Sequence, residues 1–408
     1  MEATDLIYDW NFNGKRVPDL NRLIQLDDES LRDGLQSPST SDPPLEYKLE
    51  LIILMEQLKI DGADIGFPGA SKKMYDDVTA ISKLIRDEEF NIKPNCAART
   101  VAADIEPIID ISHKVGIPIE VAAFLGSSPI RMNVENWDMP KLLKLTENAV
   151  NLCVENDVPC FFVTEDTTRA RPEDIKQIYL TAVELGAHAI CLSDTVGHAT
   201  PSGAYNLVSY VKEFLHDEGY DNIRIDWHGH RDRGLSIPNA LAAVDAGADR
   251  IHGTGVGIGE RCGNTPMDTL LVNLKLLGYP GYKDRDLKCL SEYTNLVSKM
   301  VGIPIPSNYP VMGTDAFRTA TGVHAAAIMK ARVKGETWGD VVYSGVPAAD
   351  FGKHQIIDVG PLSGISNVRF VLNNMGLDSS DETCQKVLKF AKENGRVLSQ
   401  DEIKSLFE

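Results

Sequence analysis

The sequence of 408 residues predicts a (β/α)8 TIM barrel followed by a mostly helical C-terminal appendage. Between residues 22 and 280, eight short strand-like runs alternate with eight helical stretches. A polar or glycine-rich cluster follows every strand-like run, where a barrel carries its functional residues. A doubly wound sheet is the alternative, but no glycine-rich fingerprint follows the first strand at Leu26.

The alternation begins after an N-terminal arm, residues 1–21, in which Trp10, Phe12 and Pro18 are the expected anchors. Strands are expected near residues 23–27, 62–65, 91–96, 118–124, 160–164, 189–193, 223–228 and 250–254. Helices are expected near residues 45–58, 71–85, 101–115, 139–156, 172–185, 200–215, 236–246 and 265–277. Several of these helices begin with Ser, Thr or Pro, which are typical of a first helical turn.

The alternation stops near residue 280, and residues 281–408 are predicted to form a helical linker or subdomain. Helices are expected over residues 290–300 and 324–332, with a proline-rich segment at 303–310 between them. A glycine-rich passage spans residues 341–365, and two polar helices near 381–394 and 399–407 close the chain.

Composition excludes several classes of partner. The net charge of −18 argues against binding nucleic acid or an anionic membrane, since both are bound through basic patches. No apolar run approaches ~20 residues and the N-terminus is acidic, so we expect a cytoplasmic protein without a membrane segment. Seven scattered cysteines without a Cys-x-x-Cys pair favour neither a disulfide framework nor a cysteine zinc site.

His228 and His230 lie two residues apart at the end of the seventh predicted strand. Because side chains alternate along a strand, both imidazoles face the same way and could hold a metal ion. A lone His-x-His is more often a pair of ordinary surface histidines. The clusters after the other predicted strands favour a functional role for this pair, because in a barrel all of them lie at one rim. The rim clusters fall at residues 32–36, 66–68, 99, 127–128, 165–169, 194–197, 228–230 and 257–264.

Six of these segments together resemble a known enzyme family. They are residues 31–38 (Leu-Arg-Asp-Gly-Leu-Gln-Ser-Pro), 66–68 (Gly-Phe-Pro), 164–166 (Thr-Glu-Asp), 194–197 (Asp-Thr-Val-Gly) with Pro201, 228–230 (His-Gly-His) and 257–264. The set resembles the metal-dependent Claisen-condensing family of 2-isopropylmalate, citramalate and homocitrate synthases, to which 3-hydroxy-3-methylglutaryl-CoA lyase is related. It spans the predicted barrel from residue 22 to residue 280.

The resemblance implies a divalent metal (Mn, Mg or Zn) held by Asp33, His228, His230 and Asn264, two nitrogen and two oxygen ligands. It also implies acetyl-CoA as co-substrate and a 2-oxo acid that chelates the metal. Among residues of the rim, the catalytic roles fall on Arg32, Glu165 and Glu260. Arg32 would stabilise an alkoxide and also bind the substrate, together with Thr195 and Arg231.

Two further catalytic positions implied by the resemblance lie in the appendage. They are His324, the candidate base, and Tyr343. In relatives these residues often come from the partner subunit, which implies a homodimer. A lone histidine near a helix start is as often structural as functional.

The sequence departs from the family pattern at three positions, and the interval from His324 to Tyr343 is longer than usual. Arg231 follows the His-x-His pair where asparagine is usual, Leu35 replaces a common glutamate, and Ala122 falls where synthases often have histidine. These changes bear on substrate choice more than on the metal. Too little chain follows residue 367 for the regulatory domain of many relatives, so we expect no end-product inhibition through such a domain.

The function expected from this resemblance is condensation of acetyl-CoA with 2-oxoisovalerate to 2-isopropylmalate, in leucine biosynthesis. A citramalate or homocitrate synthase type of condensation with another 2-oxo acid is the alternative. A 3-hydroxyacyl-CoA lyase would need a reactive cysteine, for which Cys262 lies in the right loop but in a synthase context. The third reading is a metal- or ligand-binding relative without activity.

Overall fold

The computed structural model describes residues 2–14 and 17–407 and divides into two compact units. One unit comprises residues 18–285 and 292–304, and the other comprises residues 1–17, 286–291 and 305–408 within the described ranges. No helix among the described residues is long and apolar enough to cross a membrane.

The larger unit is a closed barrel of eight parallel strands, as the sequence predicts. Each strand pairs with its sequence neighbours, and β1 closes the ring on β8 with Gln25 opposite Arg250. The strands are β1 (Gln25–Asp28), β2 (Gly62–Asp64), β3 (Lys93–Arg99), β4 (Glu120–Gly126), β5 (Cys160–Glu165), β6 (Ala189–Asp194), β7 (Arg224–Gly229) and β8 (Arg250–Gly253).

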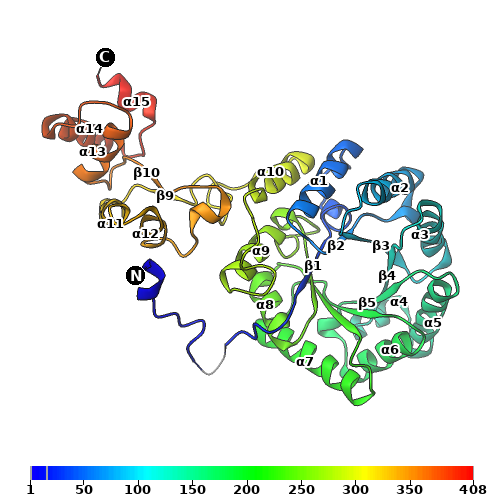
Figure 1. Ribbon diagram of the computed structural model, residues 1–408. Coiled ribbons are helices and arrows are strands. Elements are labelled where there is room, and N and C mark those ends of the chain that lie inside the picture. The colour runs from blue at the N-terminus through cyan, green and yellow to red at the C-terminus, as the bar shows by residue number, and fades with distance from the viewer. Residues whose placement is uncertain (1, 15–16, 408) are drawn as a thin grey trace. The chain divides into compact units, whose positions relative to one another are not determined.

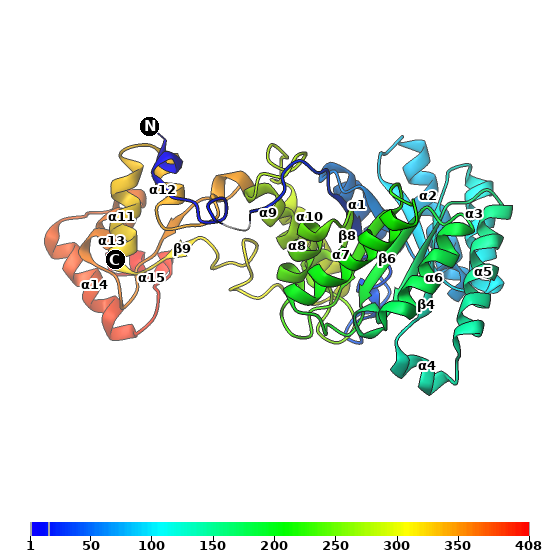
Figure 2. The same ribbon diagram turned by 90° about the horizontal axis from the view of Figure 1, so that it is seen from below.

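Helices surround the strands on the outside of the ring (Figure 1). They are α1 (Leu45–Gln57), α2 (Lys72–Asp87), α3 (Ala102–Val115), α4 (Pro129–Glu135), α5 (Met139–Glu155), α6 (Pro172–Glu184), α7 (Pro201–Asp217), α8 (Ser236–Ala246), α9 (Met267–Leu276) and α10 (Leu290–Val301). The helix α4 was not expected from sequence, and Figure 2 shows it standing off from the other helices of this unit. It is short and buries none of its residues, so it lacks the apolar stripe that predicts a helix.

The interior of the barrel is polar toward the start of several strands. Arg250 of β8 pairs with Glu120 of β4 at 3.0 Å and with Asp226 of β7 at 2.7 Å. Arg224, the first residue of β7, also pairs with Glu120 at 2.9 Å. Because β4 lies across the ring from β8, the pair of Arg250 with Glu120 ties opposite walls of the barrel together.

The smaller unit is mostly helical, with α11 (Gly322–Arg332), α12 (Glu336–Val341), α13 (Ile365–Asn374), α14 (Asp381–Asn394) and α15 (Gln400–Ser405). A small apolar core joins α13, α14 and α15 through Val368, Leu372, Val387 and Ile403. A two-stranded parallel sheet of β9 (Arg318–Thr319) and β10 (Ile356–Ile357) was not expected from sequence. Its strands have two residues each, too short to show an alternation of apolar side chains.

Candidate active site

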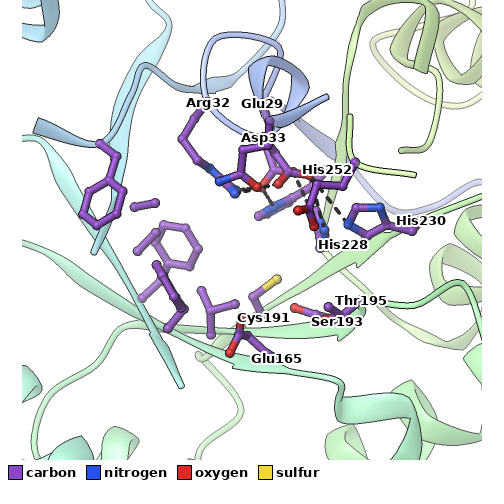
Figure 3. Close-up of a pocket in the computed structure, with 18 residues that line it drawn as sticks. Glu29, Arg32, Asp33, Glu165, Cys191, Ser193, Thr195, His228, His230 and His252 are labelled. Atoms are coloured by element: carbon purple, nitrogen blue, oxygen red, sulfur yellow. Dashed lines mark hydrogen bonds and ion pairs between the residues drawn. The ribbon is translucent and has the colours of Figure 1, made fainter. Parts of the chain in front are cut away.

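A pocket opens at the carboxyl ends of the barrel strands and is walled by side chains from most of them (Figure 3). It encloses about 780 Å³, part of which is open solvent. Arg32, Glu29 and Asp33 lie near the histidines on one side, and Cys191 lies on the other side near Glu165 and Ser193. The lining residues are Glu29, Arg32, Asp33, Gln36, Phe67, Ala97, Ala122, Phe124, Phe161, Val163, Glu165, Cys191, Ser193, Thr195, His228, His230, His252 and Glu260.

Asp33, His228 and His230 form a cluster whose candidate ligand atoms all lie within 4.8 Å of one another. The Oδ2 atom of Asp33 is 3.9 Å from Nε2 of His228 and 3.7 Å from Nε2 of His230. The two rings meet edge to face, with centroids 5.1 Å apart. One carboxylate and two imidazoles on the wall of a pocket suit zinc, manganese or a similar divalent ion.

Asn264 joins this cluster from the loop after β8. Its Nδ2 donates to Asp33 Oδ2 at 2.6 Å, while its buried Oδ1 and the buried Nδ1 of His230 have no hydrogen-bond partner. Burial and the neighbouring His228 lower the pKa of His230 to about 4, so its ring is neutral at pH 7. An acceptor oxygen without a donor and a neutral imidazole fit a metal site, because ligands must be free of protons.

The glycine-rich loop that precedes Asn264 makes this placement possible. Gly263 has a φ of +96°, and a Cβ there would overlap the carbonyl oxygen of Gly257. Asn264 then forms an isolated bridge with His230, which brings the loop after β8 against the end of β7. Glycine at position 263 thus allows the close packing of this loop against Gly257.

Arg32 lies among three carboxylates in the pocket. Its guanidinium bonds Asp64 at 2.6 Å, Asp33 at 2.8 Å and Glu29 at 3.1 Å. These contacts fix a cation directly beside the cluster, with part of the side chain still accessible. A guanidinium held in this way is preorganised to stabilise an anion that forms next to it.

Glu165 at the end of β5, and Thr195 and Glu260 in the loops after β6 and β8, also line the pocket. Burial raises the pKa of Glu165 above its ordinary value. The Thr195 hydroxyl accepts from the backbone N–H of Asp166 at 2.8 Å, which leaves its own proton for another acceptor. Glu260 is exposed and pairs with Arg261 at 3.3 Å.

The opposite wall is apolar. Phe67 and Phe124 meet edge to face with centroids 6.4 Å apart, and the small side chains of Ala97 and Ala122 lie in the same lining. Phe161, Val163 and Cys191 complete this wall. The pocket can therefore hold a ligand with an anionic, metal-chelating end and an apolar end.

The HMGL-like family profile matches residues 23–297, which cover the whole barrel. The chain belongs to the HMGL-like family.

Other members of this family resemble the chain over most of its length. A 2-isopropylmalate synthase from Pyrococcus abyssi is 30% identical over 380 residues, covering 91% of this chain and 74% of the relative. The homocitrate synthase AksA from Methanopyrus kandleri is 30% identical over 383 residues, covering 93% of this chain and 90% of the relative. The crystal structure of HMG-CoA lyase from Bacillus subtilis has the same fold, with a TM-score of 0.58 at 17% identity. That comparison covers 70% of this chain and 96% of the lyase chain.

Asn264 contacts the lining residue Asp33 without itself lining the pocket, and three more residues predicted for the site of this HMGL-like protein also lie outside the lining. Arg231 donates from Nε to the carbonyl oxygen of Cys262 at 2.5 Å, where it braces the loop that carries Asn264. His324 and Tyr343 belong to the smaller unit, where their rings stack with centroids 4.2 Å apart and both side chains are exposed. The roles assigned to these three residues stay predictions.

Glu29 and His252 were missed by sequence reasoning, although both line the pocket. His252 lies on β8 two residues after Arg250, and Glu29 directly follows β1. The strand alternation that places Arg250 inside the barrel also places His252 there, so this signal was present in the sequence. Burial alone would lower the pKa of His252, but Glu29, Asp27 and Asp226 raise it to about 10.

Proposed function

We propose that this protein is an acyltransferase that condenses acetyl-CoA with a 2-oxo acid and then hydrolyses the thioester. The favoured substrate is 2-oxoisovalerate, which gives 2-isopropylmalate, the product of the leucine-specific condensation. The observation that carries the proposal is the cluster of Asp33, His228, His230 and Asn264 beside Arg32 in a pocket with an apolar wall. Membership of the HMGL-like family and the names of the synthase relatives support it.

Asp33, His228, His230 and Asn264 would hold the divalent cation through one carboxylate, two imidazoles and one amide oxygen. When bound, such a cation polarises the keto carbonyl of a chelating 2-oxo acid and offsets negative charge on its oxygen. Thr195 is proposed to donate its free hydroxyl proton to the substrate carboxylate. Arg32 is proposed to hold the keto oxygen from the side of Asp33.

The carbon–carbon bond forms after a base removes a methyl proton from acetyl-CoA. His324 is the proposed base, supplied by the partner in a homodimer, with Tyr343 beside it. The enolate carbon attacks the keto carbon, and Arg32 stabilises the alkoxide that results. Glu165 and Glu260 complete the polar network of the pocket. Water then cleaves the thioester, which releases CoA and a carboxylic acid and makes the reaction irreversible.

The apolar wall supports the choice of 2-oxoisovalerate among candidate 2-oxo acids. The side chain of 2-oxoglutarate, used in homocitrate synthesis, ends in a carboxylate that needs a cation or donors at its far end. Phe67, Phe124 and Phe161 offer neither, and the proposed partner of Arg32 is the keto oxygen at the other end of the substrate. The branched apolar side chain of 2-oxoisovalerate fits this wall, and pyruvate would leave it largely unfilled.

The test is a panel of 2-oxo acids with acetyl-CoA, in which release of free CoA is followed with a thiol reagent. We expect 2-oxoisovalerate to give the highest kcat/KM, above pyruvate and 2-oxoglutarate, and mass spectrometry to identify 2-isopropylmalate. Release of CoA with none of the 2-oxo acids would contradict the proposal. Preference for 2-oxoglutarate would retain the condensation and overturn the assignment of the substrate.

A further inference from the structure

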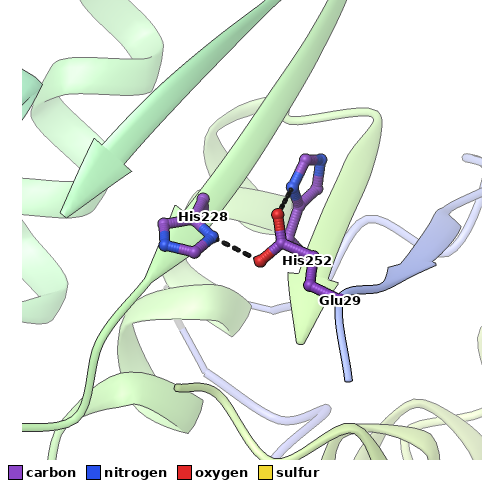
Figure 4. Close-up of side chains that lie close together, drawn as sticks. All are labelled: Glu29, His228 and His252. Atoms are coloured by element: carbon purple, nitrogen blue, oxygen red, sulfur yellow. Dashed lines mark hydrogen bonds and ion pairs between the residues drawn. The ribbon is translucent and has the colours of Figure 1, made fainter. Parts of the chain in front are cut away.

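Glu29 links the proposed metal ligands to the interior of the barrel. Its Oε2 lies 2.7 Å from Nδ1 of His228, and its Oε1 lies 3.0 Å from Nδ1 of His252 (Figure 4). The Nη2 atom of Arg32 donates to the same Oε1 at 3.1 Å. The carboxylate is buried, and these three side chains supply its hydrogen-bond partners.

Glu29, His228 and His252 could be taken for a second metal site, because one atom of each lies within 4.8 Å of the others. The distances argue against this reading. Ligand atoms on one zinc or manganese ion at about 2.1 Å lie roughly 3 Å or more apart. The separation of 2.7 Å between Glu29 and His228 is that of a direct hydrogen bond, which leaves no room for an ion.

The contact with Glu29 also determines what the other nitrogen of His228 can do. A neutral imidazole carries one proton, and a carboxylate facing Nδ1 places that proton on Nδ1. The lone pair then lies on Nε2, the nitrogen that faces Asp33 at 3.9 Å. Only this tautomer can offer Nε2 as a ligand.

His252 holds Glu29 from the opposite side. Its Nε2 lies 3.2 Å from Asp226, which is itself held by Arg224 at 2.9 Å and by Arg250 at 2.7 Å. Both ring nitrogens of His252 therefore face carboxylates. The chain Asp226–His252–Glu29–His228 runs without a break from the polar interior to the pocket.

We propose that Glu29 is a positioning residue of the active site, which fixes the tautomer of His228 and the place of Arg32, and that His252 and Asp226 anchor it. This inference rests on the proposed function, since it takes His228 as a metal ligand. It assigns a role to two pocket residues outside the predicted ligand set. Hydrogen bonds of this kind to ligating histidines commonly contribute about 10- to 100-fold in metal affinity.

Glu29→Gln is the sharpest substitution, because it keeps the shape of the side chain. A glutamine has one acceptor oxygen and one NH₂ group, while Glu29 accepts on both oxygens. Either orientation turns the NH₂ group toward a donor, His228 in one case and His252 with Arg32 in the other. We expect Glu29→Gln to bind Mn²⁺ or Zn²⁺ about 10- to 100-fold more weakly, measured by competition with a chelator.

Two variants separate the possible outcomes. Asn95→Ala removes another buried polar side chain of the barrel, which donates to Asp27, and should leave metal affinity unchanged. Asp33→Ala should abolish binding, and binding that survives this change would refute the metal site itself. Loss of metal binding in Asp33→Ala, together with wild-type metal affinity in a folded Glu29→Gln, would refute only the role of Glu29. Thermal unfolding of each metal-free variant verifies folding.

A second measurement does not depend on metal. Spectra of metal-free protein labelled with ¹⁵N-histidine, assigned by comparison with His228→Gln, report which nitrogen of His228 is protonated. We expect Nδ1–H in the wild type and loss of that uniform tautomer in Glu29→Gln. Protonation of Nε2 in the wild type would overturn the proposal.

Discussion

Arg32 makes three ion pairs with carboxylates in the pocket, so its charge is fixed in place before any substrate binds. Arg32→Lys keeps the charge but replaces a rigid fork with a single ammonium on a flexible stem. We expect kcat to fall by about 100- to 1000-fold with a smaller change in KM, because the lost interaction is strongest in the transition state.

Steady-state kinetics of Arg32→Lys check this prediction against Arg99→Lys. Arg99 also lies at the carboxyl end of a barrel strand, β3, and pairs with an aspartate, Asp104, but its side chain is largely exposed and does not line the pocket. Arg99→Lys should stay within a few-fold of wild type. An unchanged kcat with a raised KM for Arg32→Lys would make Arg32 a residue that binds ground state and transition state equally.

Asp28 is buried next to Glu29 and accepts from the hydroxyl group of Tyr293. Burial raises the pKa of Asp28 to about 7, against 3.8 for the ordinary side chain. The folded protein holds this proton between pH 4 and 7 while the unfolded chain releases it. The contribution of Asp28 to the unfolding free energy is therefore fully present below pH 4 and is lost as the pH rises through 7.

The corresponding prediction is that Asp28→Asn removes this pH dependence. The wild type should lose up to about 1.4 kcal/mol of unfolding free energy per pH unit from Asp28 over this window. Denaturant unfolding at several pH values measures the difference between the two proteins. A difference that stays constant from pH 4 to 8 would show that Asp28 ionises normally.

At the scale of elements, Arg250 of β8 connects three strands through Glu120, Asp226 and Asp27. Burial alone would raise the pKa of Glu120, but Arg250, His188 and Arg224 hold it well below its usual range. Removal of Arg250 leaves buried carboxylates without their cation. We expect Arg250→Ala to lower the unfolding free energy of the barrel by about 3–5 kcal/mol.

Lys72→Ala is the matched control for Arg250→Ala. Lys72 pairs with Asp76 at 2.6 Å on the exposed face of α2, where an ion pair contributes about 0–1 kcal/mol. Chemical denaturation followed by tryptophan fluorescence compares the two variants, since Trp227 is buried on β7. If Arg250→Ala lowered the unfolding free energy as little as Lys72→Ala, then water or local relaxation of the structure would compensate the buried carboxylates.

The elements of the barrel could be predicted because short strand-like runs alternate regularly with helical stretches between residues 22 and 280. Asp33, His228, His230 and Asn264 could be predicted because they lie in recognisable local motifs. The link from Glu29 to His252 could not, because the two residues are 223 positions apart and meet only when β1 closes on β8. The sequence prediction also missed α13, which directly follows a glycine-rich passage.

At the scale of the whole molecule, the two units divide the predicted catalytic residues between them. If His324 serves the barrel of a partner, then His324→Ala and Asp33→Ala fail for different reasons and can complement each other. A mixed dimer would carry one site with both residues intact. Random re-assembly of equal amounts should restore about a quarter of wild-type activity, because half of the dimers are mixed and half of their sites are complete.

A mixture of Asp33→Ala with His228→Ala is the control, because both lesions lie in the barrel and no mixed dimer has a complete site. It should remain inactive under the same re-assembly conditions. Recovery in neither mixture, with mixed dimers verified by tagged subunits, would mean that His324 acts on its own barrel or has a structural role.

The dependence of turnover on a divalent metal tests whether Asp33, His228, His230 and Asn264 form a catalytic metal site. Wild-type protein is stripped with a chelator, its metal content is verified, and CoA release from acetyl-CoA and 2-oxoisovalerate is measured before and after Mn²⁺, Mg²⁺ or Zn²⁺ is added. We expect turnover to fall to background on stripping, to return with at least one cation, and not to return in Asp33→Ala, while circular dichroism stays unchanged. Full turnover in the stripped wild type, or in Asp33→Ala, would contradict a catalytic metal held by Asp33.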